Sequence, residues 1–94
     1  MSPEDDFGRE DQTQAARVRR YCAETYIEPA RRKSEYIACI RTGDVHNALR
    51  FSNRLPLICS AIGAKTFETE NRIKRLAVDG PLNGANTLFV FRIL

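Results

Sequence analysis

The sequence contains no tryptophan, a single histidine and only three cysteines among its 94 residues. The number of cysteines is odd, their spacing is wide and no CxxC pair occurs among Cys22, Cys39 and Cys59. This pattern argues against a disulfide framework and against a zinc site. A cysteine nucleophile would need a base, and His46 is the one histidine available. We therefore expect the three thiols to be free and to pack as small hydrophobic side chains.

Long apolar runs are missing as well. The longest mainly apolar segments, Leu55–Ala64 and Leu88–Leu94, are far too short to span a bilayer. The acidic N-terminus does not resemble a secretory signal or a transit peptide. The sequence therefore predicts a cytoplasmic protein.

Motifs that support catalysis or hold a cofactor are also absent. There is no GxGxxG, GxxxxGK(S/T) or HExxH pattern, and no Ser/His/Asp set or pair of neighbouring carboxylates suited to acid–base chemistry is evident. We therefore expect no enzyme activity, no metal site and no cofactor.

The charge is unevenly distributed along the chain. Five acidic residues and one arginine give residues 1–11 a net charge of −4, whereas the whole chain carries +3, so residues 12–94 carry +7. We expect residues 1–11 to be a disordered acidic leader and residues 12–94 to form one folded domain. A basic domain attracts polyanions, and nucleic acid is the commonest in a cell. The leader is then either a flexible end or a tail that competes with phosphate for the basic face.

The first half of the folded part predicts a helix, a basic link and a strand. Apolar residues three and four apart indicate a helix over Thr13–Ile27. Pro29 disfavours helical geometry in the residue before it and is expected to end this helix. Pro29–Ser34 is then a basic link, either a solvated loop or a phosphate contact. β-branched and aromatic residues predict a short strand over Glu35–Arg41.

Two short helices separated by a tight polar break are predicted next. Thr42 is a suitable N-cap for the first, Gly43–Arg50. The break is Phe51–Asn53, and the second helix, Arg54–Ala64, begins there because Pro56 is tolerated only in a first turn. Helix, turn, helix is the shape that places a second helix in a DNA groove, although ordinary small cores contain it too.

The C-terminal part predicts a β-hairpin. The segments Ile73–Asp79 and Thr87–Leu94 have the composition of strands, and Gly80–Asn86 lies between them. Asn83 and Gly84 form a strong turn dipeptide, because both residue types tolerate positive φ. We therefore expect the two strands to pair antiparallel across a long tip.

The predicted order of helix, strand, helix, helix, strand, strand over Thr13–Leu94 resembles the winged helix-turn-helix family of DNA-binding domains. The resemblance lies in element order and lengths. It implies an α+β fold in which a small antiparallel sheet closes a three-helix core. It also implies that Arg54–Ala64 is the recognition helix and that Gly80–Asn86 is the tip of the wing.

Carried onto this sequence, the resemblance places DNA contacts on the second helix and on the wing. Those residues are Asn53, Arg54, Ser60, Lys65, Lys74, Arg75, Asn83 and Asn86. The outer face of Arg54–Ala64 departs from the family pattern, because small or apolar residues replace long polar ones. We therefore expect affinity to come largely from phosphate contacts by cations, which are Arg31, Arg32, Lys33, Arg50, Arg54, Lys65, Arg72, Lys74 and Arg75.

The sequence thus predicts a small winged-helix protein that binds double-stranded DNA, in transcription regulation or in a mobile-element system. The alternative is a winged-helix module that docks a protein through Pro56, Leu57 and the outer face of Thr87–Leu94. DNA-binding domains of this kind often act on two-fold sites as homodimers, with the first helix or the last strand available as an interface.

Overall fold

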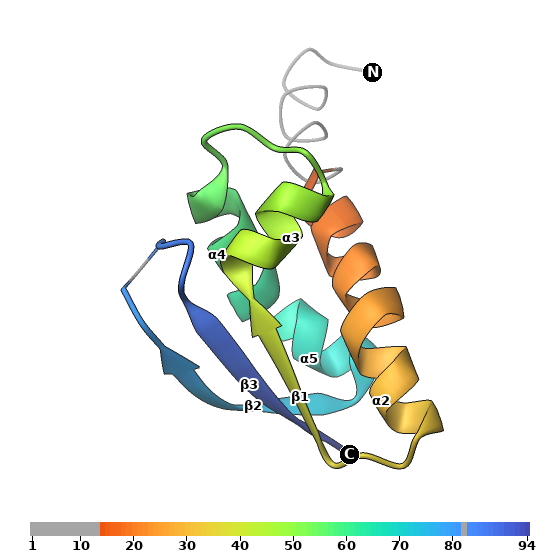
Figure 1. Cartoon of the computed structure of the whole chain (residues 1–94). Coiled ribbons are helices and arrows are strands. Elements are labelled where there is room, and N and C mark those ends of the chain that lie inside the picture. Colours follow the sequence, from red (N-terminus) through yellow and green to blue (C-terminus); the bar gives the residue numbers. More distant parts are fainter. Residues whose placement is uncertain (1–13, 82) are drawn as a thin grey trace.

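A computed structural model describes residues 14–81 and 83–94, so the predicted leader, residues 1–11, lies outside the described residues. The first helix comprises α-helical residues 14–22, a π-helical segment η1 and helix α2, without interruption (Figure 1). The elements are η1 (Ala23–Ile27), α2 (Glu28–Arg32), β1 (Ile37–Arg41), α3 (Thr42–Ala48), α4 (Leu55–Gly63), α5 (Lys65–Asn71), β2 (Ile73–Asp79) and β3 (Leu88–Ile93).

The three strands form one antiparallel sheet in the order β1-β3-β2. The predicted hairpin is confirmed, since β2 pairs with β3 from Ile73 opposite Ile93 to Asp79 opposite Leu88. The register shifts between Arg75 and Ala77, which is the signature of a β-bulge. The chain therefore belongs to the predicted α+β class, with helices packed against a small antiparallel sheet.

One face of the sheet forms the floor of the hydrophobic core. Phe89, Phe91 and Ile93 of β3 are buried, whereas the alternate residues Leu88 and Val90 are half-buried. Phe91 packs edge-on against Phe67 of α5 with ring centroids 5.4 Å apart. Two helices complete the centre of this core with fully buried side chains. They are Val18 and Cys22 of the first helix and Ile58 and Ile62 of α4.

Pro29 does not end the first helix, so the prediction of a helix over Thr13–Ile27 followed by a loop was wrong. Proline lacks an N–H, and its ring collides with the carbonyl one turn earlier in a regular α-helix. Here the preceding turn widens into the π-segment, in which the Glu28 N–H donates to the Ala23 carbonyl. The helix therefore continues to Arg32, and Arg31 and Arg32 lie on a helix rather than on a link.

A further helix occupies Lys65–Asn71, between the predicted helix Arg54–Ala64 and the predicted strand Ile73–Asp79, where the sequence predicts no helix. The chain is extended at Ala64 and then forms α5 over Lys65–Asn71. This helix carries only one fully buried side chain, Phe67, so its apolar periodicity is too weak to be recognised locally. It ends at Arg72, which adopts a left-handed conformation with φ 50°.

The long hairpin loop folds back onto the start of α3. The Thr42 N–H donates to the Thr87 carbonyl at 3.0 Å, and the Gly43 N–H donates to the Ala85 carbonyl at 2.8 Å. Thr42 is not the N-cap that the sequence predicts, because α3 begins at Thr42 itself and its hydroxyl donates to the Gly84 carbonyl at 2.6 Å. The loop is therefore held by hydrogen bonds to a helix and does not project freely. Asn83 has the expected positive φ, 58°.

Within residues 14–81 and 83–94, no helix is both long and apolar enough to cross a membrane.

Candidate nucleic-acid interface

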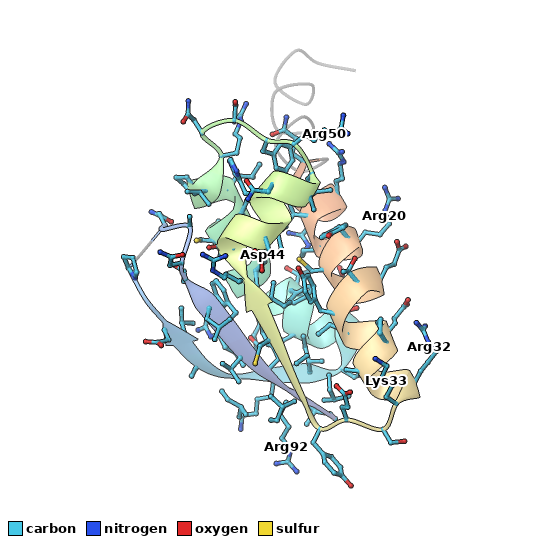
Figure 2. All side chains as sticks on the ribbon, in the orientation of Figure 1. Arg20, Arg32, Lys33, Asp44, Arg50 and Arg92 are labelled. Atoms are coloured by element: carbon cyan, nitrogen blue, oxygen red, sulfur yellow. The ribbon has the colours of Figure 1, made fainter. Side chains whose placement is uncertain are left out.

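The break between α3 and α4 is built by two residues in left-handed conformations. Arg50 has φ 58° and Asn53 has φ 54°. Asparagine accepts this geometry readily, whereas a long side chain such as arginine adopts it at a cost of about 1 kcal/mol. The break therefore turns the chain sharply between the helices, and Arg50 lies at the end of the molecule where the connecting loop runs (Figure 2).

His46 holds the loop from the side of α3. Its Nε2 accepts a hydrogen bond from the backbone N–H of Arg54 at 3.2 Å. Because Arg54 is the residue just before α4, this bond occupies one of the N–H groups at the helix start that no carbonyl of the helix can reach. His46 therefore positions the start of α4, and its Nε2 lone pair is already used.

The first helix contributes an arginine to the same loop. The Arg17 guanidinium lies 5.5 Å from the centre of the Phe51 ring, a cation–π contact, and the His46 and Phe51 rings are 6.4 Å apart. Arg17 was not among the predicted contacts, because helical periodicity places it only on a polar face of the first helix. We call Arg17, Arg50 and Arg54 the loop cluster; all three are exposed.

A groove runs along α4 on the side of β2. It encloses about 520 Å³ and is lined by Cys59, Ser60, Gly63, Arg75, Val78, Asn83, Thr87 and Phe89. We call it the α4–β2 groove. Three predicted contacts, Ser60, Arg75 and Asn83, meet here although they come from a helix, a strand and a loop. Helix α4 thus joins two areas, the loop cluster at its start and the groove along its second half.

The outer face of α4 carries small or apolar side chains. Pro56 and Ser60 are exposed, and Leu57, Gly63 and Ala64 are half-buried. None of these side chains has the length or the paired hydrogen-bonding groups that read base edges bidentately. The cations that accompany this face are therefore supplied by neighbouring elements, Arg54 before the helix and Arg75 on β2.

The two buried thiols, Cys59 in the groove wall and Cys22 in the core, stay protonated. Burial raises the pKa of the Cys59 thiol, an effect that hydrogen bonds to the Asn83 backbone and the Thr42 hydroxyl oppose in part. Burial also raises the pKa of the Cys22 thiol, to about 12. Cys59 is thus an uncharged part of the groove wall, and the charge of the groove comes from Arg75.

Arg31, Arg32 and Lys33 lie away from the loop cluster. The Arg31 guanidinium donates to the carbonyls of Asn71 at 2.7 Å and Arg72 at 3.2 Å, which ties the first helix to the end of α5. Figure 2 shows Arg32 and Lys33 at the opposite end of the first helix from Arg50. These three cations therefore belong to another part of the surface.

The remaining predicted contacts are also dispersed. Lys65 and Lys74 line a separate depression of about 410 Å³ between α5 and β2, which Arg72 also lines. The Asn86 side chain accepts a hydrogen bond from Arg41, and Arg41 forms an ion pair with Asp44 at 3.1 Å. The Asn86 side chain is therefore hydrogen-bonded near the start of α3 and does not project from the tip of the predicted wing.

No three His, Cys, Asp or Glu side chains of residues 14–81 and 83–94 lie close enough together to hold a metal ion. Comparisons of the chain with models of protein families, with curated proteins and with solved structures gave no significant match. The function must therefore be inferred from the surface itself.

Proposed function

We propose that the chain is a small winged-helix domain that binds double-stranded DNA mainly through phosphate contacts. The observation that carries the proposal is the loop cluster, because Arg17 contacts Phe51 in the same short loop that carries Arg50 and Arg54. Three exposed arginines on and beside one short loop would neutralise backbone phosphates of a duplex. The α4–β2 groove continues the same surface with Arg75, Ser60 and Asn83.

The topology supports the winged-helix part of the proposal. A helix precedes β1, helices α3 and α4 flank a tight turn, and β2 and β3 form a hairpin. Strand β3 lies between β1 and β2, so the first strand completes the sheet beside the hairpin. In a winged helix-turn-helix, α4 would be the recognition helix and the loop of residues 80–87 would be the wing. This assignment is consistent with a role in transcription regulation or in a mobile-element system.

Such contacts imply binding that depends on salt and only weakly on sequence. Phosphate contacts position a protein on the duplex without reading bases, and the outer face of α4 offers few groups for base recognition. The contact set in this proposal contains Arg17, Arg50, Arg54, Ser60, Arg75 and Asn83. It leaves out Arg31, whose guanidinium is used by α5, and Arg32 and Lys33 at the far end of the first helix.

Titration of the full chain against a short random-sequence duplex, followed by fluorescence anisotropy, tests the proposal. We expect binding at low salt that weakens steeply as salt rises, and Arg54→Ala to weaken it by roughly threefold to tenfold. Arg32→Ala removes the same charge outside the contact set and should have little effect. An absence of duplex binding at low salt would exclude the proposed function.

A second candidate function, docking of a protein on the outer face of the sheet, is favoured by a different observation. On that face Ile37 of β1 is 44% exposed, and Leu88 and Val90 of β3 are only half-buried. Tyr36, just before β1, is 78% exposed, and Leu76, at the β-bulge of β2, is 51% exposed. Exposed apolar side chains that gather on one face often mark a protein contact. A strictly monomeric chain that captures no partner from an extract of its own cell would argue against this candidate.

A further inference from the structure

The α4–β2 groove has the dimensions and the lining of a site for a small organic molecule. Its volume of about 520 Å³ falls within the range of known ligand sites, about 300–1,000 Å³. The lining includes the Phe89 ring, which is 4% exposed, and the Cys59 side chain, which is 8% exposed. Val78 adds an aliphatic wall that is 46% exposed. An apolar body that entered the groove would therefore pack on the nearly buried Phe89 and Cys59 and cover the exposed aliphatic surface of Val78.

One charged residue, Arg75, stands in this lining. Its Nη1 lies 3.5 Å from the position that a Cβ on Gly63 would occupy, so the guanidinium reaches from β2 across to α4. Its backbone N–H donates to Glu68 Oε1 at 2.8 Å, which fixes this part of the strand. Within the described part of the chain, the Arg75 side chain forms no ion pair. A guanidinium with no carboxylate partner beside an apolar wall is a suitable anchor for a carboxylate.

Two further polar groups stand among the lining residues. Ser60 offers an exposed hydroxyl from α4, and Asn83 offers an exposed side-chain amide from the loop. A few polar groups around an apolar interior fix the orientation of a ligand, whereas the apolar surface supplies most of its affinity. The combination of one cation, one hydroxyl and one amide selects a ligand with a single negative charge.

We propose that the α4–β2 groove binds a small organic anion with a flat apolar body and one carboxylate. The carboxylate pairs with the Arg75 guanidinium, and the apolar body lies over Phe89 and Val78. Because the ligand would cover Ser60, Arg75 and Asn83, it would also compete with duplex DNA for this surface. That competition rests on the proposed function, whereas the binding of the ligand does not.

Two probes of the same shape isolate the contribution of the charge. 1-Naphthoate carries a carboxylate, and 1-naphthamide replaces it with a neutral amide of similar size. Each is titrated into the isotope-labelled full chain, and amide chemical shifts are followed by NMR in the absence of DNA. We expect 1-naphthoate to shift the signals of Ser60, Gly63, Arg75 and Val78, and to bind about tenfold more tightly than 1-naphthamide. Shifts elsewhere, or equal affinities for the two probes, would overturn the proposal.

Substitutions on neighbouring residues of β2 provide the matched control. Arg75→Gln should weaken 1-naphthoate by about tenfold and leave 1-naphthamide unchanged, because only the charged probe uses the guanidinium. Lys74→Gln removes the same charge from a residue that lines the other depression, and it should change neither affinity. If Arg75→Gln and Lys74→Gln weaken 1-naphthoate equally, the groove is not its site.

Competition with DNA separates this inference from the proposed function. If the duplex binds, saturating 1-naphthoate should weaken duplex binding to the wild-type chain, and much less so to Arg75→Gln. If the duplex fails to bind but 1-naphthoate binds at the groove, the proposed function falls and the ligand site stands. If the duplex binds and 1-naphthoate does not, the ligand site falls and the proposed function stands.

Discussion

At the scale of single residues, two glycines differ in the space around them. A Cβ on Gly43 would stand 2.6 Å from the Ala85 carbonyl oxygen, which is backbone and cannot move away cheaply. A Cβ on Gly63 would meet its nearest neighbours, Arg75 Nη1 and the Phe89 ring, at 3.5 Å, an ordinary contact distance. Gly43 therefore permits the hairpin loop to approach α3, whereas Gly63 is not required by packing.

These surroundings predict opposite effects of the same substitution. We expect Gly43→Ala to lower the free energy of unfolding by about 1–3 kcal/mol through overpacking. We expect Gly63→Ala to be neutral or to raise that free energy by up to about 1 kcal/mol, because alanine is the better helix former. Urea denaturation of the two variants and the wild type measures both changes. Equal destabilisation by the two substitutions would contradict the described docking of the loop.

A buried thiol predicts how stability depends on alkaline pH. Burial raises the pKa of Cys22 from 9.0 to about 12, so the unfolded chain releases this proton at a lower pH than the folded chain does. The resulting stabilisation is complete below about pH 9 and is lost as pH rises toward 12.

We therefore expect the urea midpoint to fall between about pH 9 and pH 12, and to fall less steeply in Cys22→Ala. Cys39→Ala serves as the control, because it removes a thiol from an exposed position instead of a buried one. A Cys22→Ala variant with the pH slope of the wild type would show that this thiol is not protected by folding.

At the scale of elements, Arg31 links two helices that are distant in the sequence. Its guanidinium donates to the carbonyls of Asn71 and Arg72, which lie at the end of α5 and lack partners within that helix. We expect Arg31→Ala to lower the free energy of unfolding by about 1 kcal/mol. Hydrogen exchange of the α5 amides should speed up more than that of β3.

The adjacent arginine supplies the control for this prediction. Arg32 projects from the outer side of the helix (Figure 2) and is exposed. Arg32→Ala should change the free energy of unfolding by no more than about 0.5 kcal/mol. If Arg32→Ala destabilises the chain as much as Arg31→Ala, general charge effects rather than the link to α5 explain the loss.

The elements also show which features of this fold are local in origin. The hairpin and α4 were predictable, because the Asn-Gly turn, the alternation in β3 and the position of Pro56 are short-range signals. The continuation of the first helix past Pro29 was not predictable from local sequence, because core contacts on both sides of the proline hold the widened π-turn in place. Helix α5 was missed because its stabilisation comes from Phe67 and from Arg31, forty residues earlier in the chain.

The candidate site was predictable only in part, for a related reason. Ser60, Arg75 and Asn83 were identified individually, but the groove that unites them depends on how the hairpin loop folds back onto α3. Arg17 was missed because its contact with Phe51 joins segments that are remote in sequence. Conversely, three consecutive cations at 31–33 suggested one basic patch, although helix geometry sends neighbouring residues in different directions.

At the scale of the whole molecule, cations occupy separate regions of the surface. Arg17, Arg50 and Arg54 form the loop cluster, whereas Arg20, Arg32 and Lys33 lie along the outer side of the first helix and at its end (Figure 2). A general attraction between a basic protein and a polyanion would use both regions alike. The proposed DNA interface would use the loop cluster and would not use Arg20, Arg32 or Lys33.

The most direct test compares two charge-matched triple variants in duplex titrations between about 50 and 200 mM salt. One variant carries alanine at Arg17, Arg50 and Arg54, and the other carries alanine at Arg20, Arg32 and Lys33. We expect the first to lower the slope of log affinity against log salt by about 2 to 3 and the second to leave that slope near the wild-type value. Equal losses in the two variants, or no duplex binding by the wild type, would contradict DNA recognition through the loop cluster.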